Sequence, residues 1–161
     1  MPSFDIVSKA DFAEVDNAIN GALREISNRY DFKDSKSDII RNENDITLIG
    51  DDNYKIDQVQ QILRTYFVRR KVDTGFLEFE SIQNSSGGLL KQNAKLKLGI
   101  DREISQKINK EVKSKKIKVQ LEIRGDEIRI SSKKRDILQE CISFVKSLKF
   151  KQPLQFINFR D

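Results

Sequence analysis

The side chains best placed for chemistry in this sequence are three cations, Lys133, Lys134 and Arg135, at the expected start of a helix. They follow Ser131-Ser132 and precede an apolar stripe with helical spacing. Positive side chains are disfavoured at a helix N-terminus because the free backbone N–H groups there carry partial positive charge, whereas a bound anion is stabilised. Asp136 offsets only part of this charge. The pattern therefore predicts a phosphate-binding site.

A second group of cations follows the alternation of a strand at residues 89–98. Lys91, Lys95 and Lys97 share one face of that strand with Asn93, because successive side chains of a strand point to opposite sides. Such a row of lysines either blocks edge-to-edge association of strands or forms an anion-binding face. The sequence leaves both interpretations open.

Aromatic side chains close to cations are candidates for stacking on nucleotide bases. Tyr30 and Phe32 lie between Arg29 and Lys33, just after the first expected helix. Such a pair can clamp a base and a phosphate, but it can equally close the end of the helix as a hydrophobic contact. The aromatic signature of an RNA recognition motif is absent from the central strands. Further candidates, although a Phe in a short strand is more often core, are Phe4, Phe156 and Phe159.

The residues that would support catalysis are missing or otherwise explained. The chain has no histidine, which excludes Ser-His-Asp and Cys-His nucleophile systems and His-containing metal sites. The single Cys141 falls on the apolar stripe of a helix and is expected to be core. The carboxylates Asp51, Asp52 and Asp57 lie at a helix start, where capping accounts for them better than Mg²⁺ binding does. We therefore expect no enzymatic activity, no metal and no cofactor.

The elements that must position these residues occur twice along the chain. The order strand, helix, two strands joined by a tight turn, helix and strand runs through residues 3–80 and returns at 89–159. Apolar periodicity predicts helices over about 11–28 and 54–70, a third that opens at Asp101 as its N-cap, and a fourth on the stripe containing Cys141. A βαββαβ order is typical of the ferredoxin-like fold, in which helices cover one face of an antiparallel sheet.

Composition favours two small domains in the cytoplasm. The 161 residues are 37% hydrophobic and 34% charged, and they divide into an acidic repeat at 1–84 and a basic repeat at 89–161. Residues 1–88 carry 11 Lys/Arg against 16 Asp/Glu, whereas 89–161 carry 19 against 9. The Gly/Ser-rich stretch at 84–88 is typical of a boundary. Neither a long apolar run nor a signal-peptide pattern is present, so we expect no membrane association.

Six stretches that occur in order along the whole chain carry a resemblance to a known family. They are Ser3-Phe-Asp-Ile-Val-Ser8, Arg29-Tyr-Asp-Phe-Lys33, Ser86-Gly-Gly88 with Lys91-Gln92, Lys118-Val-Gln120 running to Gly125-Asp126, Lys133-Lys-Arg-Asp-Ile-Leu-Gln139 and Asn158-Phe-Arg-Asp161. On these stretches the chain resembles the YajQ family of bacterial nucleotide-binding proteins. It departs from that family at Lys91, where Arg is common and would add a bidentate grip on phosphate.

The resemblance implies a fold and a function. The fold is α+β, with two tandem ferredoxin-like domains that exchange their first strands, here residues 3–8 and 89–98. Members of the family bind purine nucleotides and RNA such as tRNA, and no catalytic activity is established for them. Some are receptors for cyclic di-GMP that act through a transcription regulator.

We therefore expect a non-enzymatic protein that binds nucleotides (GTP, ATP or cyclic di-GMP), tRNA or both through its basic second domain. The alternative is a cyclic di-GMP effector or adaptor that acts through a protein partner. If the first strands are exchanged, Phe4 and Asp5 share a sheet with Arg124, Arg129 and Phe159, which allows base stacking, guanine-edge recognition and phosphate contacts in one place. The candidate binding residues are Phe4, Asp5, Arg29, Tyr30, Phe32, Lys33, Lys91, Gln92, Lys95, Arg124, Arg129, Lys133, Lys134, Arg135, Phe159 and Arg160.

Overall fold

The computed structural model describes all 161 residues, which form two compact units. One unit consists of residues 10–97 and is continuous in sequence; we call it the inserted unit. The other is assembled from residues 1–9 and 98–161, on either side of that insertion, and we call it the split unit. Each unit has its own four-stranded antiparallel sheet and two long helices.

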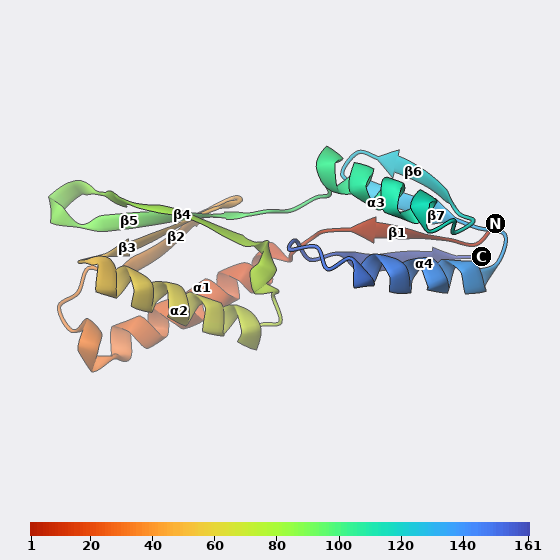
Figure 1. Ribbon diagram of the computed structural model, residues 1–161. Helices are drawn as coiled ribbons and strands as arrows, with labels where there is room; N and C mark the ends of the chain where they lie inside the picture. The colour runs from red at the N-terminus through yellow and green to blue at the C-terminus, as the bar shows by residue number, and fades with distance from the viewer. The chain divides into compact units, whose positions relative to one another are not determined.

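In the inserted unit, helices α1 and α2 cover one face of the sheet (Figure 1). The strand order is β2-β3-β5-β4, and every pairing is antiparallel. The elements are α1 (Phe12–Asn28), a 3-10 turn η1 (Tyr30–Phe32), β2 (Asp38–Asn42), β3 (Asp45–Gly50), α2 (Asn53–Arg69), η2 (Thr74–Phe76), β4 (Leu77–Asn84), η3 (Ser86–Gly88) and β5 (Leu90–Leu96). Both helices begin and end within one residue of the bounds that apolar periodicity predicts.

The split unit repeats this plan with the order β6-β7-β1-β8, again fully antiparallel. Its elements are β1 (Ser3–Val7), α3 (Arg102–Ser114), β6 (Gln120–Arg124), β7 (Glu127–Ser131), α4 (Arg135–Ser147) and β8 (Gln155–Arg160). Phe4 and Ile6 of β1 are fully buried against the apolar faces of α3 and α4. Cys141 belongs to this core, and burial raises the pKa of its thiol to about 11.

The first strand of each sequence repeat lies in the sheet of the other repeat. β1 pairs with β7 and β8, and β5 pairs with β3 and β4, so both exchanged strands are interior strands of their sheets. The expected fold class, two ferredoxin-like βαββαβ units with exchanged first strands, is confirmed. As a consequence, a sequence repeat lacks the middle of its own sheet, whereas residues 10–97 contain a whole sheet.

Asp5 links β1 to its two neighbouring strands on the face of the sheet that the helices do not cover. Only 4% of Asp5 is exposed, and its carboxylate accepts hydrogen bonds from Arg129 Nε at 3.0 Å and from Asn158 Nδ2 at 2.9 Å. One donor comes from β7 and the other from β8, so the carboxylate joins three strands. The hydrogen bond from Arg129 holds the pKa of Asp5 below its usual range, although burial opposes this effect.

We predict that Asp5→Asn destabilises the protein by about 2 kcal/mol at pH 7, because it leaves the Arg129 guanidinium without its buried partner. The folded-state pKa of Asp5 is lowered, so its contribution is present above the unfolded pKa and is lost as pH falls through the folded value. The difference between the variant and the wild type should therefore shrink between pH 7 and pH 3. Urea unfolding at the two pH values measures it, and a difference independent of pH would contradict the assignment.

Glu122→Gln is the matched control for that experiment. Glu122 also lies on the sheet of the split unit, but it is exposed and is 3.8 Å from its nearest cation, Arg124. Exposed pairs of this kind contribute less than about 1 kcal/mol, so this variant should unfold almost as the wild type does.

The exchange of strands also predicts which fragments fold. Residues 10–97 should give a cooperative thermal transition followed by circular dichroism, because they contain all four strands of the inserted unit. Residues 1–88 should not, because they lack β5, the interior strand that β3 and β4 both pair with. Equal cooperativity of the two fragments would show that β5 is dispensable.

Candidate functional site

The start of α4 differs from that of the other three long helices. Asp11, Asp52 and Asp101 are the N-cap residues of α1, α2 and α3, and each accepts a hydrogen bond from a backbone N–H of its helix. The N-cap of α4 is Lys134, which provides no such bond, and the first helical residue is Arg135. Cations therefore stand where the other helices carry a carboxylate, as the sequence pattern predicts.

A cavity of about 610 Å³ lies beside this helix start. We call it the lysine cavity; it is lined by Met1, Lys118, Val119, Gln120, Ser131, Ser132, Lys133, Lys134 and Ile137. All three lysines are exposed, and none of them forms an ion pair with a carboxylate. The buried Ser132 hydroxyl donates to the carbonyl oxygen of Lys118 at 3.2 Å and so links the two segments that carry the lysines.

Lys118 is a cation of this cavity that sequence reasoning left out of the candidate residues. It lies 15 positions before Lys133 and immediately precedes the region where β6 pairs with β7. The register Gln120 to Ser131 brings it next to the start of α4. A hairpin prediction that included this register would have identified it.

A second cavity, of about 350 Å³, also adjoins the start of α4. We call it the arginine cavity; it is lined by Pro2, Ser3, Arg135, Leu138, Gln139, Phe159, Arg160 and Asp161. The ring of Phe159 is 58% exposed and stacks on Phe4, with ring centroids 5.9 Å apart and an interplanar angle of 30°. Arg135 forms an ion pair with Asp161. This cavity therefore combines an aromatic surface with two guanidinium groups.

Phe4 and Asp5 do not join Phe159 in the single binding surface that we expected. Phe4 is fully buried and cannot stack on a base, although it supports Phe159 from within the core. Asp5 points to the opposite face of the sheet, because adjacent residues of a strand alternate, and its oxygens are already bonded to Arg129 and Asn158. Arg129 is occupied by the same pairing. Arg124 is exposed at the end of β6 and is not among the residues that line the lysine or arginine cavity.

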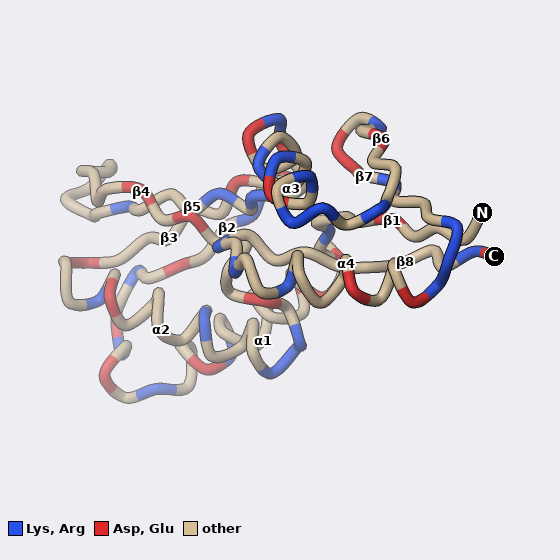
Figure 2. The backbone as a smooth tube through the Cα atoms, turned by 45° about the vertical axis from the view of Figure 1, so that its right-hand side comes forward, with Lys and Arg blue, Asp and Glu red and all other residues tan.

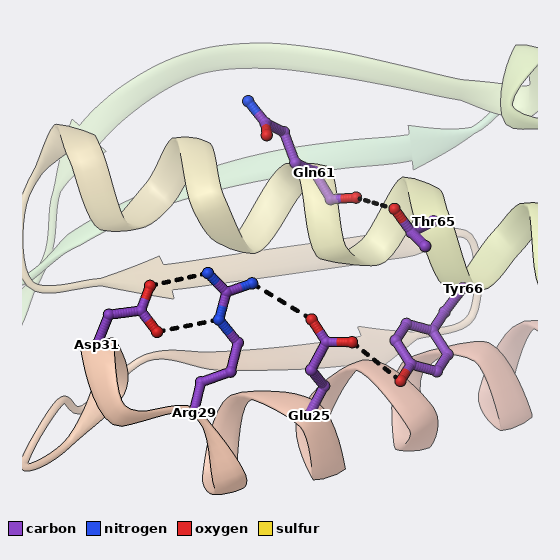
Figure 3. Close-up of polar contacts among 6 residues, drawn as sticks. All are labelled: Glu25, Arg29, Asp31, Gln61, Thr65 and Tyr66. Atoms are coloured by element: carbon purple, nitrogen blue, oxygen red, sulfur yellow. Dashed lines mark hydrogen bonds and ion pairs between the residues drawn. The ribbon is translucent and has the colours of Figure 1, made fainter.

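The aromatic pair near the end of α1 does not form a clamp either. Figure 3 shows Arg29 bound to the carboxylates of Asp31 and Glu25, and Tyr66 donating its hydroxyl hydrogen bond to Glu25. Arg29 therefore ties η1 to α1. Phe32 is only 5% exposed, whereas Tyr30 is 89% exposed. Phe32 thus closes the helix end, which was the alternative that the sequence left open.

The remaining candidates also belong to the inserted unit. Lys33 is exposed after η1, and Lys95 is exposed on β5 opposite Asp45 and Glu78. Lys91 is partly buried, and Gln92 donates a hydrogen bond to the carbonyl oxygen of Glu80 at 2.9 Å. None of them is among the residues that line the cavities beside α4.

Strand exchange also redistributes charge between the units. The split unit contains 17 Lys/Arg against 10 Asp/Glu, a net charge of +7, whereas the inserted unit contains 13 against 15, a net charge of −2. Figure 2 shows the cations on α3 and at the start of α4. The structure therefore gathers five of the candidate residues around the start of α4: Lys133, Lys134, Arg135, Phe159 and Arg160.

No group of three or more Cys, Asp or Glu side chains is arranged to hold a metal ion. None of the helices is both long enough and apolar enough to span a bilayer.

Comparison with known proteins assigns the chain to a family. The model of the family described as "Nucleotide-binding protein YajQ-like" matches residues 2–160. A nucleotide-binding protein of Rhodospirillum centenum is 56% identical over 161 residues, and one of Magnetococcus marinus is 52% identical; both alignments cover the whole of each chain. A nucleotide-binding protein of Exiguobacterium is 44% identical over 98% of this chain and 97% of its own. The chain therefore belongs to the YajQ-like family.

Proposed function

We propose that this protein is a non-enzymatic nucleotide-binding protein that holds phosphate groups in the lysine cavity. The observation that carries the proposal is the combination of an uncapped helix start with three unpaired lysines around one cavity. The names of the relatives, all called nucleotide-binding proteins, support the same ligand class. The paired or capping carboxylates elsewhere in the chain support a role in binding rather than catalysis.

The electrostatics of the cavity suit a phosphate. Lys118, Lys133 and Lys134 bring three positive charges that no carboxylate neutralises, and the backbone N–H groups at the start of α4 add partial positive charge. A phosphate adds negative charge to a helix start whose first turn has a single carboxylate, Asp136. Its binding therefore relieves the repulsion among the cations that surround it.

The arginine cavity offers a place for a base. Phe159 presents one ring face while the buried Phe4 supports the ring from behind, so stacking requires little rearrangement. Arg135 and Arg160 lie beside the ring and can contact a phosphate or a base edge. Purine mononucleotides, cyclic di-GMP and tRNA all present a phosphate and a base, and direct comparison of their affinities distinguishes them.

We predict that the double variant Lys133→Glu/Lys134→Glu binds its nucleotide ligand at least about tenfold more weakly than the wild type, because two phosphate contacts become repulsive. The slope of log K against log salt should fall by about 2 for the same reason. Binding of GTP, ATP, cyclic di-GMP and tRNA to nuclease-treated protein, measured over a salt series, tests both expectations.

Lys36→Glu/Lys71→Glu is the control for net charge. Both lysines are exposed, form no ion pair and lie in the inserted unit. If this control weakens binding as much as the variant at 133 and 134 does, overall charge explains the effect and the lysine cavity is not the site.

Phe159→Ala should weaken binding by about 5- to 150-fold, because stacking of a base on an aromatic ring contributes roughly 1–3 kcal/mol. The salt slope should not change, since the lost contact is not ionic. Phe159→Tyr, which keeps the ring, should bind as the wild type does. Fluorescence anisotropy with a labelled ligand measures all three proteins, and equal affinity of the Ala and Tyr variants would remove Phe159 from the site.

A further inference from the structure

The solvent-facing side of α2 carries a stripe of uncharged residues. The buried residues of this helix face the core of the inserted unit. The stripe runs along the opposite side in steps of four, three, four and three residues, which keep side chains in line along a helix. We call it the α2 stripe; its members are Tyr54, Gln58, Gln61, Thr65 and Val68. Gln58 is partly exposed and the other four are exposed.

The two ends of the α2 stripe are apolar. Tyr54 is 64% exposed and Val68 is 67% exposed, and of the large hydrophobic side chains only that of Tyr30 is more exposed. By contrast, the exposed side of α3 carries Lys107 and Lys110. The centre of a protein–protein interface is depleted of charged residues and enriched in tyrosine. The composition of the α2 stripe is therefore typical of a surface that another protein covers.

The α2 stripe is symmetric about Gln61. Tyr54 and Val68 both lie seven residues from Gln61, which is about 10.5 Å along the helix at about 1.5 Å per residue. Figure 3 shows the Gln61 side chain extending from α2 on the side away from α1. A second α2 that runs antiparallel, related by a twofold axis at the level of Gln61, therefore places its own Val68 opposite Tyr54. It also places its Thr65 beside Gln58.

Opposite charges accompany one flank of the stripe. Asp57 and Arg64 are seven residues apart, about two helical turns, so both lie on the same flank. Neither forms an ion pair within the molecule. Asp57 accepts a hydrogen bond from Gln61 Nε2 at 3.0 Å, and the Arg64 guanidinium lies 4.7 Å from the ring centroid of Phe79.

The same symmetry brings these two charges together. A twofold axis between two antiparallel helices sets each flank against the same flank of the second helix. Asp57 lies four residues before Gln61 and Arg64 three residues after it, so Asp57 comes within about 1.5 Å, along the helix, of the second copy's Arg64. The contact occurs twice, once on each side of the axis. Both charges that lack a partner within one chain are thus paired between two copies.

The cations on the other flank are held within their own molecule. Lys55 donates a hydrogen bond to the carbonyl oxygen of Asp31, and its Nζ lies 4.6 Å from the ring centroid of Phe32. The Arg69 guanidinium lies 4.7 Å from the ring centroid of Tyr66. These contacts keep the two positive groups away from the centre of the stripe.

We propose that α2 docks against α2 of a second copy of this chain, as an antiparallel pair centred on Gln61. The symmetry of the stripe and the complementary charges on its flank favour a second copy, because one set of residues supplies both halves of the interface. A single helix face buries less than the about 800 Å² per partner of a standard interface, so the dimer should be weak and reversible. None of the five residues lines the lysine or arginine cavity, so this proposal is independent of the proposed function.

Sedimentation equilibrium of the full-length protein, from about 5 to about 500 µM, tests for the dimer. The wild type should show a monomer–dimer equilibrium. Val68→Glu should weaken association at least tenfold, because it places two carboxylates in the apolar contacts with Tyr54. Ile40→Glu is the matched control, since Ile40 is 50% exposed in the same unit but lies on β2, beside the buried Ile39 and on the opposite face of the sheet. It should change association less than twofold.

Exchange of the flanking charges tests the antiparallel register. Asp57→Arg and Arg64→Asp should each weaken association about tenfold, because like charges then meet at both symmetric contacts. An equimolar mixture of the two variants should associate as tightly as the wild type, because a dimer with one copy of each pairs opposite charges at both contacts. Recovery in the mixture also shows that each variant is folded.

Three results would overturn the proposal. A wild type that stays monomeric over the whole concentration range would exclude a second copy as the occupant of the stripe. Equal weakening by Val68→Glu and Ile40→Glu would place the association elsewhere. A mixture that associates no more tightly than the single variants would refute the register centred on Gln61.

Discussion

The packing of β1 inside the sheet of the split unit is the interaction on which the rest of this structure depends. Its apolar side, Phe4 and Ile6, fills the core beneath α3 and α4, and its polar side, through Asp5, binds donors from both neighbouring strands. The same strand supports the ring of Phe159 and begins beside the start of α4. Fold and candidate site therefore share one structural element, and a change that loosens β1 alters both.

The distribution of charge follows the two folded units and not the two sequence repeats. Strand exchange places Lys91, Lys95 and Lys97 in the inserted unit, where Glu78 lies 3.5 Å from Lys97. The cations that remain in the split unit include the unpaired lysines of the lysine cavity. A surface of unneutralised lysines is costly to maintain without a ligand, because like charges repel across a few ångströms. This cost is the physical reason to regard the start of α4 as a binding site.

Sequence patterns predicted the local features well and the long-range ones poorly. Apolar periodicity gave the helices, and the cluster at residues 133–135 gave the helix start that the structure places between two cavities. Alternation along a strand says which residues share a face, but not which neighbour covers that face, so Phe4 was wrongly considered for stacking. Only the family resemblance predicted the exchange of strands, because neither β1 nor β5 has a local sequence feature that indicates which strands it pairs with. The register between β1 and β8 shifts between Ser3 and Asp5, and Asn158 of β8 adopts a left-handed φ of 57°. This bulge has no sequence signal beyond the tolerance of Asn for left-handed backbone.

The division of the chain into an inserted and a split unit also sets an order of events during synthesis. Translation from the N-terminus delivers β1 first, but its partners β7 and β8 lie more than 110 residues later. The inserted unit can complete its sheet once β5 has emerged, while β1 still presents its apolar side to the solvent or to chaperones. The arginine cavity needs β1 and β8 together, so it forms only when nearly the whole chain has been made. A nascent chain therefore has a folded acidic unit well before it has any basic surface to offer a nucleotide.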